Sequence, residues 1–182
     1  MNYPTNLIEI IGAVTLPRVP YFLAREGFQE EHSVRSVRFA LFGQNFKVLI
    51  RDYVEENVPA MRIKAGKLLD RATNDEISAA LGRGTRTVPL AHIFGLLALQ
   101  PSGEVPDPTI DRFLVVHEHA ENIFHLKGTD WAIRAEQEGG GWHLGANRIS
   151  QHQPRHQDGG VTGDRVFFDA TEPVRESSKG FC

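Results

Sequence analysis

Cysteine is nearly absent from the sequence. The only one among the 182 residues is Cys182, at the very end of the chain. A single thiol forms no disulfide within the chain and cannot supply a zinc site built from several thiolates. This composition is typical of a reducing compartment, so we expect a cytoplasmic protein.

The sequence also lacks a long uninterrupted apolar run. The apolar stretch near the N-terminus has no basic region before it, and Glu9, Pro17 and Pro20 interrupt it. A signal peptide or a transmembrane helix needs a continuous apolar segment. We therefore expect no association with a membrane.

Positive charge is not in excess either. The chain has 20 Lys and Arg against 23 Asp and Glu, which gives a net charge of -3 at pH 7. A basic field is what draws proteins onto phosphate backbones, so non-specific nucleic-acid binding is disfavoured. With 41% hydrophobic and 24% charged residues, the composition is that of a globular protein whose core needs no metal or disulfide.

The motifs of the common enzyme classes are missing. The sequence has no Walker A loop, no GxGxxG after a predicted strand and no GxSxG elbow. No spacing of Ser, His and Asp selects a catalytic triad. We therefore assign no catalytic residue, predict no cofactor and favour a protein that is not an enzyme.

Three strands are predicted in the first half of the chain. The first is rich in β-branched residues and ends at Pro17, and the other two show apolar residues that alternate with polar ones. These strands cover residues 7–16, 34–42 and 61–65. In the second strand Val37, Phe39 and Leu41 share one face. The third presents a basic, solvated face opposite its apolar one.

Helical spacing predicts an amphipathic helix after the second strand. It rests on five apolar side chains at i, i+3, i+4, i+7 and i+8, which are Phe46, Leu49, Ile50, Tyr53 and Val54. Asn45 is its expected N-cap, and the helix should end before Pro59.

Two further helices are predicted before the chain midpoint. Thr73 and Glu76 have the spacing of a capping box ahead of a short helix that ends at Gly82. The next helix begins at Thr87, tolerates Pro89 in its first turn and runs to the following proline. Its apolar face is broad, which predicts burial.

The second half of the chain repeats strand and turn. Strands are predicted at residues 112–119, 122–127, 131–137, 142–149 and 165–170. Glycine-containing turns at 128–130 and 139–141 favour an antiparallel meander, whereas residues 150–164 form a long polar loop. We predict one α+β domain over residues 1–172, in which a strand and helix portion (1–101) packs with a β-meander (110–170), followed by a frayed tail (173–182).

Several segments resemble those of a group of small uncharacterised bacterial proteins. The segments NIFHLK, GGGWHLGANRI and GDRVFF resemble the NIFYV-type, GGW-type and G-x-RVF-type strands of that group. The resemblance extends over most of the stretch from Val14 to Phe168 and departs from the group where FDA replaces SRN. It implies a single domain and supplies no catalytic residue.

One candidate function is sequence-specific DNA binding. The segment from Thr73 to Val88 resembles the TN-x-EI-x-x-x-L pattern of LuxR-type helix-turn-helix domains. Pro89 would then lie inside the recognition helix, and Arg83 and Arg86 are the only nearby cations. Two ordinary helices joined by a glycine-rich turn are the favoured interpretation.

A second candidate is a metal site in a small metal-dependent hydrolase. His117 and His119 lie two residues apart on a predicted strand and so point to one face. Neighbouring strands would add His125 or His143, and three imidazoles suit a divalent transition metal such as zinc. The alternative is that these histidines are polar turn residues facing water.

The leading hypothesis is a binding or accessory protein that acts through another protein, with a phage or mobile element as one possible origin. Its expected surface combines hot-spot residue types, namely Trp131, Trp142, Arg148, Arg155, His156 and Arg165. The alternative for the two tryptophans is that they begin adjacent strands and pack as a cross-strand pair in the core.

Overall fold

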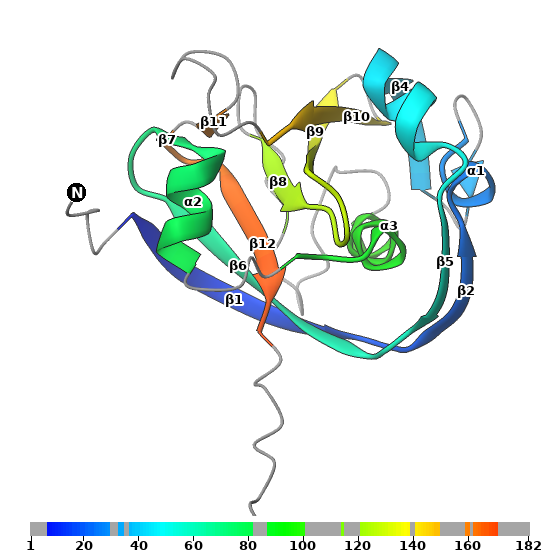
Figure 1. Cartoon of the computed structure of the whole chain (residues 1–182), viewed down its shortest axis with the longest axis horizontal. Coiled ribbons are helices and arrows are strands. Elements are labelled where there is room, and N and C mark those ends of the chain that lie inside the picture. Colours follow the sequence, from blue (N-terminus) through cyan, green and yellow to red (C-terminus); the bar gives the residue numbers. More distant parts are fainter. Residues whose placement is uncertain are drawn as a thin grey trace, which may run out of the picture.

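A curved eight-stranded sheet wraps around a buried helix in the computed structural model of the chain (Figure 1). The structure describes residues 7–29, 33–34, 37–81, 87–100, 114, 121–138, 141–149, 159–160 and 162–170. The helical elements are α1 (Ala24–Gly27), the π-helix η1 (Phe46–Ile50), α2 (Asn74–Leu81) and α3 (Leu90–Leu99). The predicted mixed α+β fold is confirmed.

The large sheet has the strand order β1-β6-β12-β8-β9-β10-β4-β3. Its strands are β1 (Ile8–Leu16), β3 (Ser33–Val34), β4 (Val37–Phe42), β6 (Met61–Leu68), β8 (Asn122–His125), β9 (Trp131–Glu138), β10 (Gly141–Arg148) and β12 (Arg165–Asp169). Two smaller pairs are formed by β2 (Val19–Leu23) with β5 (Val54–Val58) and by β7 (Ala72–Thr73) with β11 (Gly159–Gly160).

The predicted antiparallel meander is confirmed for β8, β9 and β10. The chain then leaves the meander, and β12 returns to its other side, where it pairs parallel with β8 and antiparallel with β6. On the far side β10 pairs parallel with β4. The sheet is therefore mixed, and strands from the first half of the chain extend it at both edges. Apart from Leu114, which is buried and lies in a bend, the predicted strand at residues 112–119 lies outside the described residues.

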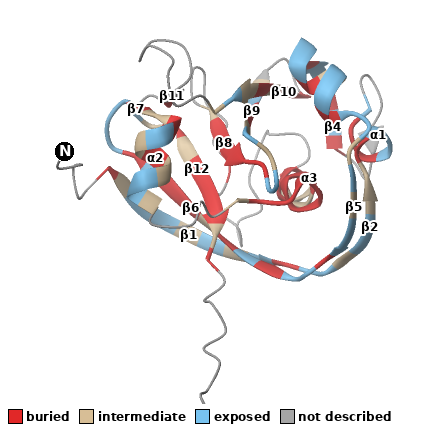
Figure 2. Ribbon diagram, in the orientation of Figure 1, coloured by how far each residue is buried: buried red, intermediate tan, exposed pale blue. Residues whose placement is uncertain are grey.

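Both faces of the central strands are covered. Alternate side chains enter two apolar clusters, so that Phe124 packs in the large cluster with α3 while Ile123 packs in a smaller one with Ile77 of α2. This explains why all four residues of β8 are buried, a pattern that one-sided strands do not show. Figure 2 shows α3 buried in the hollow of the sheet, and α2 with an exposed outer face.

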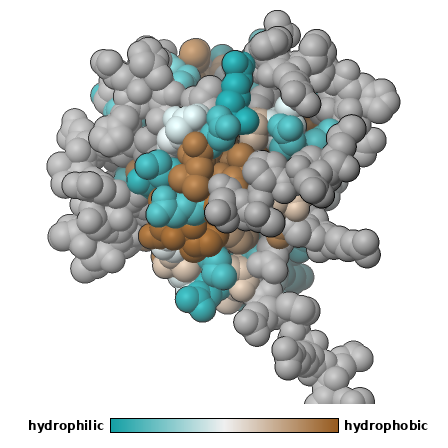
Figure 3. Space-filling model, turned by 90° about the vertical axis from the view of Figure 1, so that its left-hand side faces the viewer, coloured by the Kyte–Doolittle hydropathy of each residue, from teal (hydrophilic) through white to brown (hydrophobic). Residues whose placement is uncertain are grey.

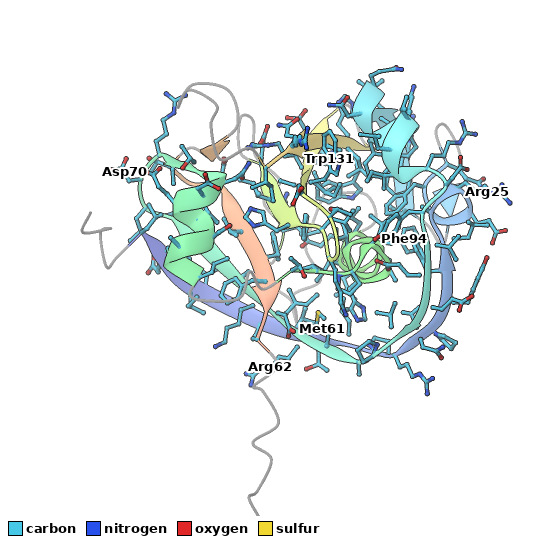
Figure 4. The ribbon with its side chains drawn as sticks, in the orientation of Figure 1. Arg25, Met61, Arg62, Asp70, Phe94 and Trp131 are labelled. Atoms are coloured by element: carbon cyan, nitrogen blue, oxygen red, sulfur yellow. The ribbon has the colours of Figure 1, made fainter. Side chains whose placement is uncertain are left out.

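Strand β6 has the predicted alternation. Met61 is buried and Arg62 is exposed. In Figure 4 their side chains leave the ribbon on opposite sides, with Met61 pointing into the molecule and Arg62 away from it. The apolar face of the strand therefore packs against the core, and the basic face points to solvent.

The capping box at the start of α2 is also confirmed. The Thr73 backbone N–H donates to Glu76 Oε2 at 2.8 Å, and the Glu76 backbone N–H donates to Thr73 Oγ1 at 3.2 Å. These reciprocal bonds satisfy two of the N–H groups that a helix start leaves unpaired. The helix ends at Leu81, and Gly82 lies outside the described residues.

The long helix predicted from Asn45 toward Pro59 is wrong in its second half. The helical turns end near Ile50, and residues Val54–Val58 form β5 instead, paired antiparallel with β2. Asn45 is itself helical, and its amide donates to the Ala146 carbonyl at 3.0 Å rather than capping a helix. Pairing with β2 determined that this segment is a strand, and local periodicity does not predict such pairing.

Leu41 was predicted on the buried face of β4, but it is 50% exposed, whereas Phe42 is buried. The pairing with β10 shows the reason, because consecutive residues Trp142 and His143 face Phe39 and Leu41. The extra residue on β4 makes a β-bulge, and a bulge reverses the side-chain alternation that follows it.

Helix α3 confirms the predicted buried helix, although it begins three residues later than Thr87. Val88 first pairs with Leu126 in a parallel bridge. The carboxylate of Glu55 on β5 then accepts hydrogen bonds from the Leu90 and Ala91 backbone N–H groups, both at 2.8 Å. A distant strand thus supplies the cap, since Pro89 has no side-chain acceptor.

Replacing Glu55 by Ala should lower the free energy of unfolding by about 1–2 kcal/mol, because two N–H groups at the start of α3 lose a charged acceptor. Urea denaturation measures the change. Glu56→Ala is the matched control, since Glu56 is exposed on the same strand. Equal losses in the two variants would contradict the capping role.

The described part of the chain contains no helix that combines the length and the apolar content needed to cross a bilayer. Figure 3 shows that apolar side chains nevertheless gather in the middle of the face at the left of Figure 1. The elements at that side, β1 and α2, carry Ile8 and Leu81, which pack against the smaller cluster and are only partly buried.

Candidate functional site

Two of the predicted partner-binding residues lie side by side. Trp131, at the start of β9, pairs directly with Arg148 at the end of β10. Both line a cavity of about 400 Å³, which we call the tryptophan cavity. Trp131 is labelled in Figure 4. Its lining residues are Leu49, Ile50, Tyr53, Gly128, Thr129, Asp130, Trp131 and Arg148.

The turn that holds Trp131 is fixed by local hydrogen bonds. Gly128 has a φ of 76°, which glycine adopts without steric cost. Thr129 Oγ1 donates to the Leu126 carbonyl at 3.2 Å and accepts from the Trp131 backbone N–H at 3.2 Å. These bonds fix the backbone from which the indole of Trp131 projects.

A second contact ties this turn to the helical segment across the cavity. The Tyr53 hydroxyl donates to the Lys127 carbonyl at 3.3 Å. Burial, followed by the nearby Glu55 carboxylate, raises the pKa of Tyr53 above its ordinary value of 10. The hydroxyl therefore remains a donor at neutral pH, and both walls of the cavity are held in place.

Exposed apolar side chains border the tryptophan cavity. Val48 is 66% exposed and Leu49 is 44% exposed, and the two are consecutive on η1. In Figure 2 the helix near the top of the view, which contains η1, shows mainly exposed residues. Apolar side chains that gather beside a cavity are typical of binding surfaces, whereas scattered ones are not.

The other predicted partner-binding residues lie elsewhere. Trp142 is in the core, where its Nε1–H donates to the Gln100 carbonyl at 3.1 Å. Arg165 is on β12, between β8 and β6. Arg155 and His156 lie outside the described residues.

The alternative prediction that Trp131 and Trp142 form a cross-strand pair is wrong. Trp131 faces Arg148, and Trp142 faces Gln137. Antiparallel strands begin at opposite ends of their hairpin, so two residues that start them cannot meet.

The predicted histidine cluster is not assembled by the described strands. His125 on β8 faces Ala132, whereas His143 on β10 faces Glu136. The two facing residues on β9, Ala132 and Glu136, are four positions apart, which is about 13 Å along the strand. Among the described residues, no group of three His, Cys, Asp or Glu could hold a metal ion. His117 and His119 lie outside the described residues, so a site built on them stays a prediction.

His125 instead joins a buried polar contact beneath α2. Its Nδ1 lies 3.3 Å from Ser78 Oγ, and its Nε2 has no hydrogen-bond partner in the described part of the chain. Burial lowers the pKa of His125 to about 4, so the ring is neutral at neutral pH. Asn74, one turn before Ser78, is buried as well. No sequence motif marks this contact, because α2 and β8 are far apart in the chain.

The helix-turn-helix interpretation is wrong for the second helix. Seven of the ten residues of α3 are buried, and the sheet surrounds it. A recognition helix must present exposed side chains to the major groove, which α3 cannot do in this fold. Arg83 and Arg86 lie outside the described residues.

No protein-family model matches the chain, and it has no significant match among curated proteins or solved structures. The resemblance to the bacterial group stays a prediction. The function is therefore inferred from the geometry of the surface itself.

Proposed function

We propose that this protein binds another protein through the tryptophan cavity and the apolar residues of η1 beside it. The observation that supports the proposal is the pairing of Trp131 with Arg148 in the wall of a preformed cavity. Trp, Tyr and Arg are the residue types most enriched among binding hot spots, and Tyr53 completes the set here.

The chemistry of the cavity favours a short segment with one bulky apolar side chain beside a carboxylate. The apolar side chain would fill the space between Trp131 and Leu49. Arg148 is exposed and has no ion-pair partner within the described residues, so it is available to a carboxylate. Val48 would extend the apolar contact outside the cavity.

Selection from a displayed peptide library tests this proposal. We expect the enriched peptides to share an aromatic or large aliphatic residue next to Asp or Glu. Trp131→Ala should weaken their binding about 30-fold, the effect of losing a hot spot worth roughly 2 kcal/mol, and Arg148→Gln should weaken it about tenfold. Fluorescence anisotropy with a labelled peptide measures both.

Leu41→Ala is the matched control, because Leu41 is an exposed apolar residue on β4 that does not line the cavity. It should leave the affinity unchanged. A library without a shared motif, or peptides that bind wild-type protein and Trp131→Ala equally, would rule out this surface as the binding site.

A further inference from the structure

A second cavity lies by η1 and shares no lining residue with the tryptophan cavity. It has a volume of about 340 Å³, and we call it the cationic cavity. Three cations, three phenylalanines and one amide line it, namely Arg25, Lys47, Arg51, Phe28, Phe42, Phe46 and Gln29. None of the described residues that line it is acidic. Arg25 and Trp131, one from each cavity, lie well apart in Figure 4.

The apolar wall of the cationic cavity is rigid. The Phe28 ring meets Phe46 edge-on, with centroids 5.3 Å apart, and Phe42 stacks on Phe46 at 5.2 Å. All three side chains are at least nine-tenths buried. Aromatic rings held against each other present a flat, preformed surface to a ligand.

The charged wall comes from two separate segments. Arg25 belongs to α1, whereas Lys47 and Arg51 lie four residues apart at η1 and its end, so that they share one side of the helical turns. Neither Arg25 nor Arg51 forms an ion pair with a residue that the structure describes. Guanidinium groups bind carboxylates and phosphates with two parallel hydrogen bonds.

The π-helix produces this arrangement. Phe46 and Ile50 are both buried, while Lys47 and Arg51 follow each of them on the cavity side. A π-helical turn is rare and is found frequently at functional sites. Its position between the two cavities is consistent with a binding role.

We propose that the cationic cavity binds a small organic anion with a flat apolar body. The anionic group, a carboxylate or a phosphate, lies between Arg25 and Arg51, and the apolar body lies against the phenylalanine wall. The volume falls in the range of small-molecule sites. The three cations among the described lining residues favour anions over metal cations and basic ligands. This site is independent of the proposed protein-binding surface.

Titration with three probes of similar shape tests the proposal. The probes are naphthalene-2-carboxylate, 2-naphthyl phosphate and the neutral 2-naphthamide, followed by NMR shifts of the backbone amides. We expect both anions to bind at least about tenfold more tightly than the amide, since a charged hydrogen bond is lost. The shifts should centre on residues 25–29 and 42–51. The tighter anion identifies the natural head group as carboxylate or phosphate.

Three variants locate the anionic group. Arg25→Gln and Arg51→Gln should each weaken anion binding about tenfold and leave amide binding unchanged. Arg38→Gln, an exposed arginine of β4 outside the cavity, should change nothing. All three positions are exposed, so circular dichroism should show the same fold. Equal affinity for the amide, equal losses in all three variants, or no binding at millimolar probe would overturn the proposal.

Discussion

Replacing Trp142 by Ala should lower the free energy of unfolding by about 4 kcal/mol. Trp142 is the largest fully buried side chain, with 0% exposure. It lies where β10 pairs with β9 and with Phe39 of β4, so its loss leaves a cavity at a junction of three strands. The indole also donates to the carbonyl of Gln100, whose side chain accepts from the Leu114 backbone N–H at 2.6 Å.

Guanidinium denaturation of Trp142→Ala measures the loss. Trp142→Phe keeps most of the volume and removes the N–H donor, so it should cost only about 1–2 kcal/mol. Trp131→Ala is the second comparison, because Trp131 is only partly buried and should affect binding more than stability. If Trp131→Ala destabilised the protein more than Trp142→Ala, the assignment of one tryptophan to the core and the other to the surface would be wrong.

The stability of the protein should fall by about 2 kcal/mol between pH 7 and pH 5 because of His125 alone. Burial lowers the pKa of His125 to about 4 in the folded protein, against an ordinary value of 6.5 in the unfolded chain. Between these two values the unfolded chain binds the proton and the folded protein does not. Stability from this residue is therefore complete above pH 6.5 and is lost as the pH falls toward 4.

Urea denaturation at a series of pH values measures this dependence. His125→Gln removes the titrating group, so the difference between wild-type and variant curves isolates it from the carboxylates. Burial also lowers the pKa of His92, whose Nε2 lies 2.9 Å from the Pro59 carbonyl. His92 therefore contributes to the pH dependence of stability with the same sign in both proteins. Parallel curves for wild type and His125→Gln would show that the ring is not desolvated as the structure indicates.

Local sequence signals predicted the elements that depend on their own residues. The capping box of α2 involves Thr73 and Glu76, three residues apart, and it formed as expected. The hairpin turn at Gly128 needed only a glycine that tolerates positive φ. The broad apolar face of α3 predicted burial, because such a helix presents little polar surface to water.

Local sequence signals gave a wrong prediction where a segment pairs with a strand that is distant in the sequence. Val54 continues the helical spacing of Phe46 and Ile50, yet it pairs with Leu23 of β2. The bulge that turned Leu41 outward depends on the register with β10, about a hundred residues later. Neither partner can be read from the segment itself, since strand pairing is set by contacts that are remote in sequence.

The candidate site was likewise predicted from the sequence only in part. Residue type alone selected Trp131 and Arg148 as binding residues, and their closeness follows from the register of one hairpin. Leu49 and Tyr53 of the same cavity were assigned to a core-facing helix, and the cationic cavity was not anticipated at all. Both cavities lie between segments that only the folded chain brings together.

Local signals in the sequence were enough to predict the α+β composition, the hairpins of the second half and the locally capped helix α2. The tertiary structure decided the order of the strands, the return of β12 between β6 and β8, and the two cavities beside η1. The physical reason is the distance along the sequence over which each kind of interaction acts. Capping, turn geometry and apolar periodicity act over a few residues, whereas sheet order and cavity shape arise from packing among segments more than 20 residues apart, such as Phe28 and Phe94.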